Sequence, residues 1–314
     1  MKAFVRYLAV NTPRPEAMAD YYKKYFGLSE VVRSPEGDIA LSDGWFKLCL
    51  LAQWPDDEIA GMSHYGIAVD DLDELQARLK QFGGPAEIGR DRGGDFHGEY
   101  YVLDPHGMPW SISTSEFGMR GGVAKPFGVP RIRHAELSVG ETHRQMEWMI
   151  DVFGLREINC SKKIRDAGSK FAIRMLGDGI INVTFLPFDH VHPKVMSARQ
   201  TEHKWAVQHF GWVVPDMMGL LKHLPGQQLD MGGGTGNMAE WQAHDPIRTA
   251  SICRRTRDLR SISTYGNAAT GLAARRRGFT FRPKDRELFR DHDALGGIGM
   301  IFADEGITPG RERV

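Results

Sequence analysis

The chain has 314 residues, of which 41% are hydrophobic and 25% charged, and its 40 Lys and Arg residues are balanced by 40 Asp and Glu residues. This composition is typical of a globular protein and excludes disorder over the whole chain, and the length predicts two domains. Because no basic excess is present to neutralise phosphates, we do not expect a nucleic-acid partner.

Apolar segments of membrane-spanning length are absent from the sequence. Residues 1–12 are typical of a mixed apolar and polar strand rather than a signal peptide, and apolar stretches such as 48–52 are far shorter than the roughly 20 residues of a membrane span. We therefore expect a cytoplasmic protein without a membrane partner. The 3 cysteines form no C-x-x-C pair, which favours reduced thiols in the core.

In chain order, a strand within residues 1–12 is followed by a helix over 15–26, whose apolar side chains lie on one face and whose left-handed cap is Gly27. Short β-branched or aromatic runs follow, bounded by Gly, Asp or Pro. A second helix over 71–82 begins with acidic residues and ends at Gly83. Each half of the chain is thus predicted to contain two strand–helix–strand–strand–strand units.

The second half repeats the first. Four matches recur in the same order, namely a strand and helix ending in F-G-L (26–28 and 153–155), a D-G turn (43–44 and 178–179), an H-[YF]-G strand (64–66 and 209–211) and a D-P turn (104–105 and 245–246). A segment rich in Gly and Pro joins the halves. We predict an N-terminal domain over 1–118, a linker over 119–130, a C-terminal domain over 131–253 and a tail over 254–314.

With these motifs in this order, the chain resembles a two-domain member of the vicinal oxygen chelate superfamily, which includes glyoxalases, bleomycin-resistance proteins and extradiol dioxygenases. The resemblance covers about residues 1–246. It implies an α+β fold in which tandem paired βαβββ modules form two open, U-shaped mixed sheets. Such a fold does not fix the activity, because one fold hosts many reactions.

Metal-binding members of this superfamily take one ligand from the first strand of a module, one from the central strand and a carboxylate from the last. In the second half, the matching positions are His134, His209 and Ile252, so the carboxylate is missing. Since side chains two residues apart on a strand share a face, Glu136 lies on the same face as His134. Glu136 is therefore predicted as a substitute ligand or general base, with a solvent-facing residue as the alternative.

In the first half, the corresponding positions are Tyr7, His64 and Ser111, which retain one ligand type of three. This half cannot hold a divalent ion in the same way. We expect it to be the structural copy, with its degenerate site at most a wall of the pocket.

Two imidazoles and a carboxylate leave open positions on iron or manganese for substrate oxygens and dioxygen. The resemblance therefore implies an Fe(II)- or Mn(II)-dependent oxygenase acting on a small catechol-like or other vicinal-dioxygen molecule. With Zn(II) or Ni(II), a glyoxalase-like lyase or isomerase is the alternative. A metal-free, ligand-sequestering protein of the bleomycin-resistance kind is another. His192 or His203 resembles the acid–base histidine of ring-cleaving relatives, with solvated loop histidines as the alternative, and homodimers are common in the superfamily.

The tail changes in character. From residue 254 onward it is rich in arginine, has the single lysine Lys284 and shows no strand alternation. We interpret this as a shift of reading frame just after Asp245-Pro246, which would place an aspartate at the position of Ile252 in the original frame. Resequencing that finds an intact frame would remove this hypothesis. If it holds, the chain as written lacks its third ligand and its final strand and could be inactive.

Overall fold

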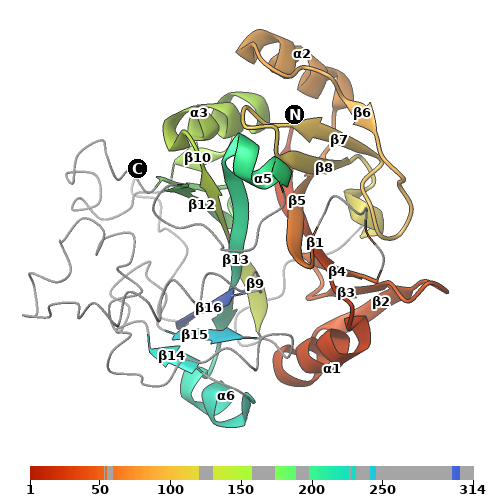
Figure 1. The fold of residues 1–314 in the computed structure, drawn as a ribbon, viewed down its shortest axis with the longest axis vertical. Coiled ribbons are helices and arrows are strands. Elements are labelled where there is room, and N and C mark those ends of the chain that lie inside the picture. Colours follow the sequence, from red (N-terminus) through yellow and green to blue (C-terminus); the bar gives the residue numbers. More distant parts are fainter. Residues whose placement is uncertain are drawn as a thin grey trace, which may run out of the picture.

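The computed structural model describes residues 1–52, 54, 59–119, 130–157, 174–188, 198–225, 228–230, 241–244 and 299–304 (Figure 1). The first module consists of β1 (Ala3–Asn11), α1 (Pro15–Phe26), β2 (Ser29–Arg33), β3 (Ile39–Ser42), β4 (Lys47–Leu51), β5 (Gly61–Val69), α2 (Leu72–Phe82), β6 (Gly89–Arg90), β7 (Tyr100–Leu103), β8 (Pro109–Ser113) and the short 3₁₀ helix η1 (Glu116–Gly118). The second consists of β9 (Arg131–Val139), α3 (Thr142–Phe153), β10 (Arg156–Glu157), β11 (Arg174–Gly177), β12 (Asn182–Pro187), α5 (Ala198–His203), β13 (Trp205–Val214), α6 (Met217–His223), β14 (Gln228–Asp230), β15 (Trp241–His244) and β16 (Gly299–Asp304).

Both modules have the same sheet topology. The first is an eight-stranded sheet in the order β2-β3-β4-β1-β5-β8-β7-β6, and the second is an eight-stranded sheet in the order β10-β11-β12-β9-β13-β16-β15-β14. In each, the first strand pairs in parallel with the fourth and antiparallel with the fifth. The predicted α+β fold of two open mixed sheets is confirmed.

The two helices predicted for the first module are present. Helix α1 begins at Pro15, where a missing N–H costs nothing, and ends before Gly27, whose φ of 64° is the left-handed cap expected from the sequence. Helix α2 begins after Asp71, whose side chain accepts a hydrogen bond from the backbone N–H of Glu74. Local capping chemistry thus sets the ends of both helices.

In the second sheet β16 has the place that β8 has in the first: it pairs in parallel with β13 and antiparallel with β15. This strand lies within the segment 254–314, so that segment contributes to the second sheet, and the sheet does not end at residue 253. Ile252 and the turn at 245–246 lie outside the described residues. The frame-shift hypothesis stays a prediction.

Each module's first helix packs on its own sheet and also contacts the sheet of the other module. Phe26 of α1 lies against Trp212 of β13, with ring centroids 4.3 Å apart, and Trp148 of α3 lies 6.1 Å from Trp110 of β8. Figure 1 shows these helices at opposite ends of the molecule, α1 at the bottom and α3 at the top. Because buried aromatic side chains dominate core energetics, this exchange joins the two modules in one hydrophobic core.

Two repeat-related aspartates connect the modules reciprocally. Asp43 of the first module accepts a hydrogen bond from the backbone N–H of Ile132 at the start of β9 (2.9 Å), and Asp178 of the second accepts one from the N–H of Val5 in β1 (2.7 Å). Each aspartate also accepts two N–H bonds from its own turn. The repeated D-G motif is thus a structural link, which we call the aspartate exchange.

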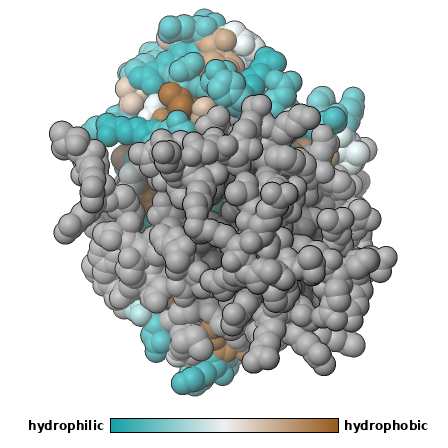
Figure 2. Space-filling model, turned by 90° about the vertical axis from the view of Figure 1, so that its left-hand side faces the viewer, coloured by the Kyte–Doolittle hydropathy of each residue, from teal (hydrophilic) through white to brown (hydrophobic). Residues whose placement is uncertain are grey.

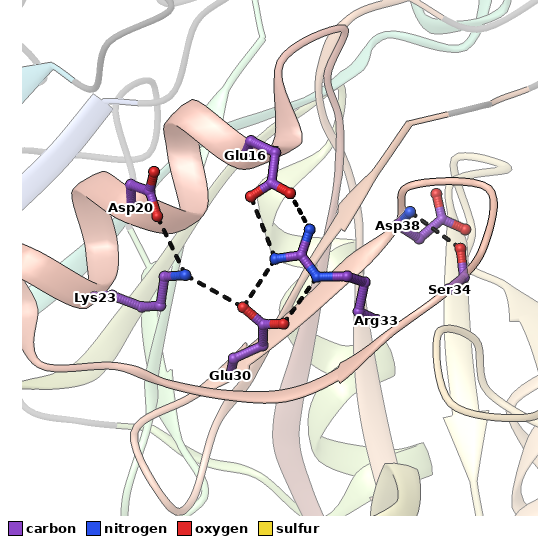
Figure 3. A network of polar contacts seen from close by, with 7 residues as sticks. All are labelled: Glu16, Asp20, Lys23, Glu30, Arg33, Ser34 and Asp38. Atoms are coloured by element: carbon purple, nitrogen blue, oxygen red, sulfur yellow. Dashed lines mark hydrogen bonds and ion pairs between the residues drawn. The ribbon is translucent and has the colours of Figure 1, made fainter.

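Charged side chains cover the solvent side of α1. Arg33 of β2 reaches Glu30 (Nε–Oε1, 3.0 Å) and Glu16 of α1 (Nη2–Oε2, 3.2 Å), and Lys23 reaches Glu30 (3.2 Å; Figure 3). Such exposed pairs contribute little to stability, because water and salt screen them. The pairs connect β2 to α1 at the surface, and neither element depends on them for its formation.

The outer face of α3 is also polar, and Nε2 of His143 lies 3.1 Å from Oε1 of Glu147. Figure 2 shows that the described residues at the top of the molecule, in the region of α2 and α3, are mostly hydrophilic. None of the helices in the described part of the chain is long and apolar enough to cross a membrane. Cys49 is a free, buried thiol, as predicted, and burial raises its pKa to about 12.

Candidate metal centre

Three predicted site residues meet on the inner face of the second sheet. His134 and Glu136 come from β9, and His209 comes from the adjacent antiparallel strand β13, where it is in register with Glu136. Alternation along β9 puts residues 134 and 136 on one face, as the sequence predicts. One ligand atom from each of the three side chains lies within 4.8 Å of the other two.

The distances between these atoms suit a common ion. Nε2 of His134 and Nε2 of His209 are 3.2 Å apart. When two nitrogens bind one metal at about 2.0–2.1 Å and the N–metal–N angle is between a right angle and the tetrahedral angle, the nitrogens lie about 2.9–3.4 Å from each other. Glu136 brings Oε1 to 3.3 Å from Nδ1 of His209 and Oε2 to 3.9 Å from Nε2 of His134. Oε2 is thus the carboxylate oxygen near the facing Nε2 atoms, while Oε1 faces the other ring nitrogen of His209.

Hydrogen bonding leaves the two Nε2 atoms facing each other. Nδ1 of His134 donates to the amide oxygen of Asn182 on β12, and Nδ1 of His209 faces Glu136. If each ring carries its proton on Nδ1, the two Nε2 lone pairs face one another, an arrangement that a cation between them would stabilise. Carboxylate and amide partners of this kind are the usual means of orienting histidine ligands.

The electrostatics of the cluster favour a positive ion. Burial lowers the pKa of His209 to about 4, against the opposing effect of Glu136, so its ring is neutral at pH 7 and able to bind a metal. Glu136 lies beside this ring, with its Oε1 3.3 Å from Nδ1 of His209. The cluster thus combines a neutral nitrogen donor, from His209, with a half-buried carboxylate.

The first module helps to position His209. The hydroxyl of Tyr65 on β5 donates a hydrogen bond of 2.8 Å to the backbone carbonyl of His209, and both groups are buried. This contact crosses between the modules at the central strand of each sheet. The sequence holds no sign of it, because it depends on how the two sheets pack.

In the first module the equivalent positions are closed. Nε2 of His64 pairs with Oγ of Ser111 at 2.9 Å, and Tyr7 is fully buried, with its hydroxyl donating to the carbonyl of Phe96. Phe117 of η1 stacks on Tyr7 with centroids 4.7 Å apart. An aromatic ring therefore fills the place that the metal cluster has in the second module.

We expect Gly66→Ala to destabilise the protein by about 1–3 kcal/mol through overpacking. A Cβ at Gly66 would lie 2.7 Å from Cζ of Phe117 and 2.9 Å from Cδ1 of Tyr7. Chemical denaturation of the wild type and the variant measures the loss. An unchanged midpoint would mean that Phe117 leaves this place at little cost.

The register position at which a carboxylate was expected on the last strand holds another residue type. In the first sheet Gly66 pairs with Ser111, and in the second the matching Gly211 pairs with Ile301 of β16. Ile301 thus has the register position in the second sheet that Ser111 has in the first. Glu136, the predicted substitute, is the carboxylate that the described residues bring to the histidines.

The two proposed acid–base histidines do not join the cluster in the described structure. His192 lies outside the described residues. His203 is exposed at the end of α5, where its ring lies next to Gly107 of the first module. From Trp205 to His209 alone, β13 extends by about 13 Å at roughly 3.3 Å per residue, which separates His203 from the site.

Comparison with known proteins supports the fold. Residues 5–112 match the family model described as the Glyoxalase/Bleomycin resistance protein/Dioxygenase superfamily. A catechol 2,3-dioxygenase structure is 16% identical, with a TM-score of 0.52, over 78% of this chain and 85% of that one. A halotolerant catechol dioxygenase is 14% identical, with a TM-score of 0.50, over 77% and 83% of the two chains.

A third similar structure is the 2,2',3-trihydroxybiphenyl 1,2-dioxygenase from dibenzofuran-degrading Sphingomonas wittichii strain RW1. It is 12% identical, with a TM-score of 0.51, over 78% of this chain and 88% of that one. At such identities these likenesses establish the fold alone. No curated protein matches the sequence.

Proposed function

Since the chain belongs to the glyoxalase/bleomycin resistance protein/dioxygenase superfamily, we propose that its second module binds a divalent metal ion through His134, Glu136 and His209. We further propose that the protein is a metal-dependent oxygenase acting on a small catechol-like or vicinal-dioxygen molecule. The observation that carries this proposal is the 3.2 Å approach of the two Nε2 atoms beside the half-buried carboxylate of Glu136.

Iron(II) or manganese(II) held by two imidazoles and a carboxylate would offer open coordination positions at which substrate oxygens and dioxygen meet. The residues of this chain supply the rest of the arrangement. Asn182 holds the tautomer of His134 that leaves Nε2 free, and Glu136 orients His209 and balances the charge of the ion. The similar fold of the catechol dioxygenases supports the choice of an aromatic diol as substrate.

The function is tested by loading the purified full-length protein with Fe(II) without oxygen and then measuring oxygen uptake with a panel of catechols. We expect uptake that requires both substrate and metal and that a chelator abolishes. Turnover of a hemithioacetal without oxygen uptake would replace the oxygenase by a lyase or isomerase. Tight binding of a ligand that is indifferent to chelator would replace it by a sequestering protein.

His64→Ala is the matched control for this assay, because His64 has the same place in the first module but pairs with Ser111. Its oxygen uptake should equal that of the wild type. Loss of oxygen uptake in His64→Ala would contradict the proposal, because the reaction would then depend on the first module. His192 stays a predicted acid–base residue, to be tested by the same assay on His192→Gln.

A further inference from the structure

A second strand contributes side chains to the face that carries the metal cluster. Strand β12 runs parallel to β9, with Asn182 in register with His134 and Thr184 in register with Glu136. Residues in register on paired strands point to the same face of a sheet. The contact between Asn182 and His134 identifies this face as the inner one. Thr184 is therefore directed toward the same face as Glu136.

The hydroxyl of Thr184 is buried, and the described part of the chain offers it no hydrogen-bond partner. The residue is 3% exposed, and its Oγ1 is buried without a hydrogen-bond partner among the described residues. An unpaired buried hydroxyl destabilises a fold, so such groups are rare and call for an explanation. An oxygen supplied by a ligand would provide the missing partner.

The repeat shows that the fold does not require a hydroxyl here. In the first module the same pairing places Cys49 opposite Ala9. Both belong to a small apolar cluster that also contains Tyr7 and Phe117. One copy thus has an apolar contact where the other has a carboxylate beside an unpaired hydroxyl, so this polarity is specific to the module with the metal cluster.

We propose that Oγ1 of Thr184 is a hydrogen-bonding subsite for one oxygen of the substrate at the metal centre, namely a hydroxyl or phenolate oxygen of a planar vicinal diol. The proposal rests on the proposed function of the centre. A threonine hydroxyl both donates and accepts, so it pairs with the oxygen in either protonation state. In this role Thr184 selects diols that are correctly oriented, while His134, Glu136 and His209 hold the ion.

The test is Thr184→Val, which replaces the hydroxyl by a methyl group of similar shape. Three quantities are measured on the full chain: manganese content, denaturation midpoint, and affinity of the Mn(II)-loaded protein for catechol without oxygen. We expect unchanged manganese content, an equal or higher midpoint, and an affinity for catechol about 5- to 100-fold lower, the range for one lost hydrogen bond that leaves a buried partner unpaired.

Thr12→Val is the matched control. Thr12 is also fully buried, but its Oγ1 accepts a hydrogen bond of 3.1 Å from the backbone N–H of Arg14, at a distance from the cluster along the chain. This variant should lower the midpoint and leave the affinity for catechol unchanged. The two threonines are thus expected to respond in opposite ways.

The outcomes separate the two proposals. Equal catechol affinity in the wild type and Thr184→Val would overturn the subsite alone, and so would a lower midpoint in Thr184→Val, because the hydroxyl would then have a partner within the protein. If the Mn(II)-loaded wild type fails to bind catechol, the proposed function falls and the subsite falls with it.

Discussion

His209→Ala is expected to lower the affinity of the protein for Mn(II) by at least about 100-fold, since even the loss of a residue that merely orients a ligand costs 10- to 100-fold. His209 is buried and its Nε2 lies 3.2 Å from that of His134, so alanine removes one of two converging nitrogen donors. Metal analysis after dialysis and titration calorimetry with Mn(II) measure the effect.

The control for this prediction lies in the repeat. His64→Ala removes the equivalent imidazole of the first module and should leave manganese binding unchanged. Glu136→Gln separates the contribution of the carboxylate charge, and its affinity should lie between those of the wild type and His209→Ala. Equal affinities in the wild type and His209→Ala would show that the ion, if bound, lies elsewhere.

The second large effect is expected at the aspartate exchange. Asp178→Ala should lower the free energy of unfolding by at least about 3 kcal/mol, because three backbone N–H groups, of Val5, Ile180 and Ile181, lose their acceptor. Domains are stable by only about 5–15 kcal/mol, so this is a large fraction of the total. Urea denaturation followed by tryptophan fluorescence measures it, since tryptophans lie in both modules.

The pH dependence of the free energy of unfolding shows whether Asp178 is the group responsible. Burial raises the pKa of Asp178 from 3.8 to about 6, so the folded chain holds this proton more tightly than the unfolded chain does. The stabilisation from that proton is fully present below pH 4 and is lost as the pH rises through 6. The wild type should therefore exceed Asp178→Asn in stability by more at pH 4 than at pH 7. A difference that is constant with pH would contradict this assignment.

Much of the fold could be predicted from the sequence, because its signals are local. Helix α1 follows from Pro15, the spacing of its apolar residues and the cap Gly27, and the duplication follows from motifs that recur in order. Strand alternation also predicted that His134 and Glu136 share a face. The convergence of His209 on them required the antiparallel pairing of β9 and β13, which the resemblance implied.

Other parts depend on long-range packing and could not be foreseen. Asn182 and Thr184 enter the site through the register between β12 and β9, which no single segment encodes. Phe117 stacks on Tyr7 in the first module, and its backbone φ is 56°. Such a φ is uncommon for a residue other than glycine. The contribution of β16 to the second sheet likewise reflects pairing between distant segments.

The aspartate exchange bears on how the duplicated chain could evolve. Each half supplies an acceptor for the first strand of the other half, so deleting or separating either half would remove a hydrogen bond from an interior strand of the remaining sheet. Selection for folding alone would then preserve the half without a metal cluster, long after that half had ceased to take part in any reaction. The sequence of the first module could then change wherever it does not contact the second module.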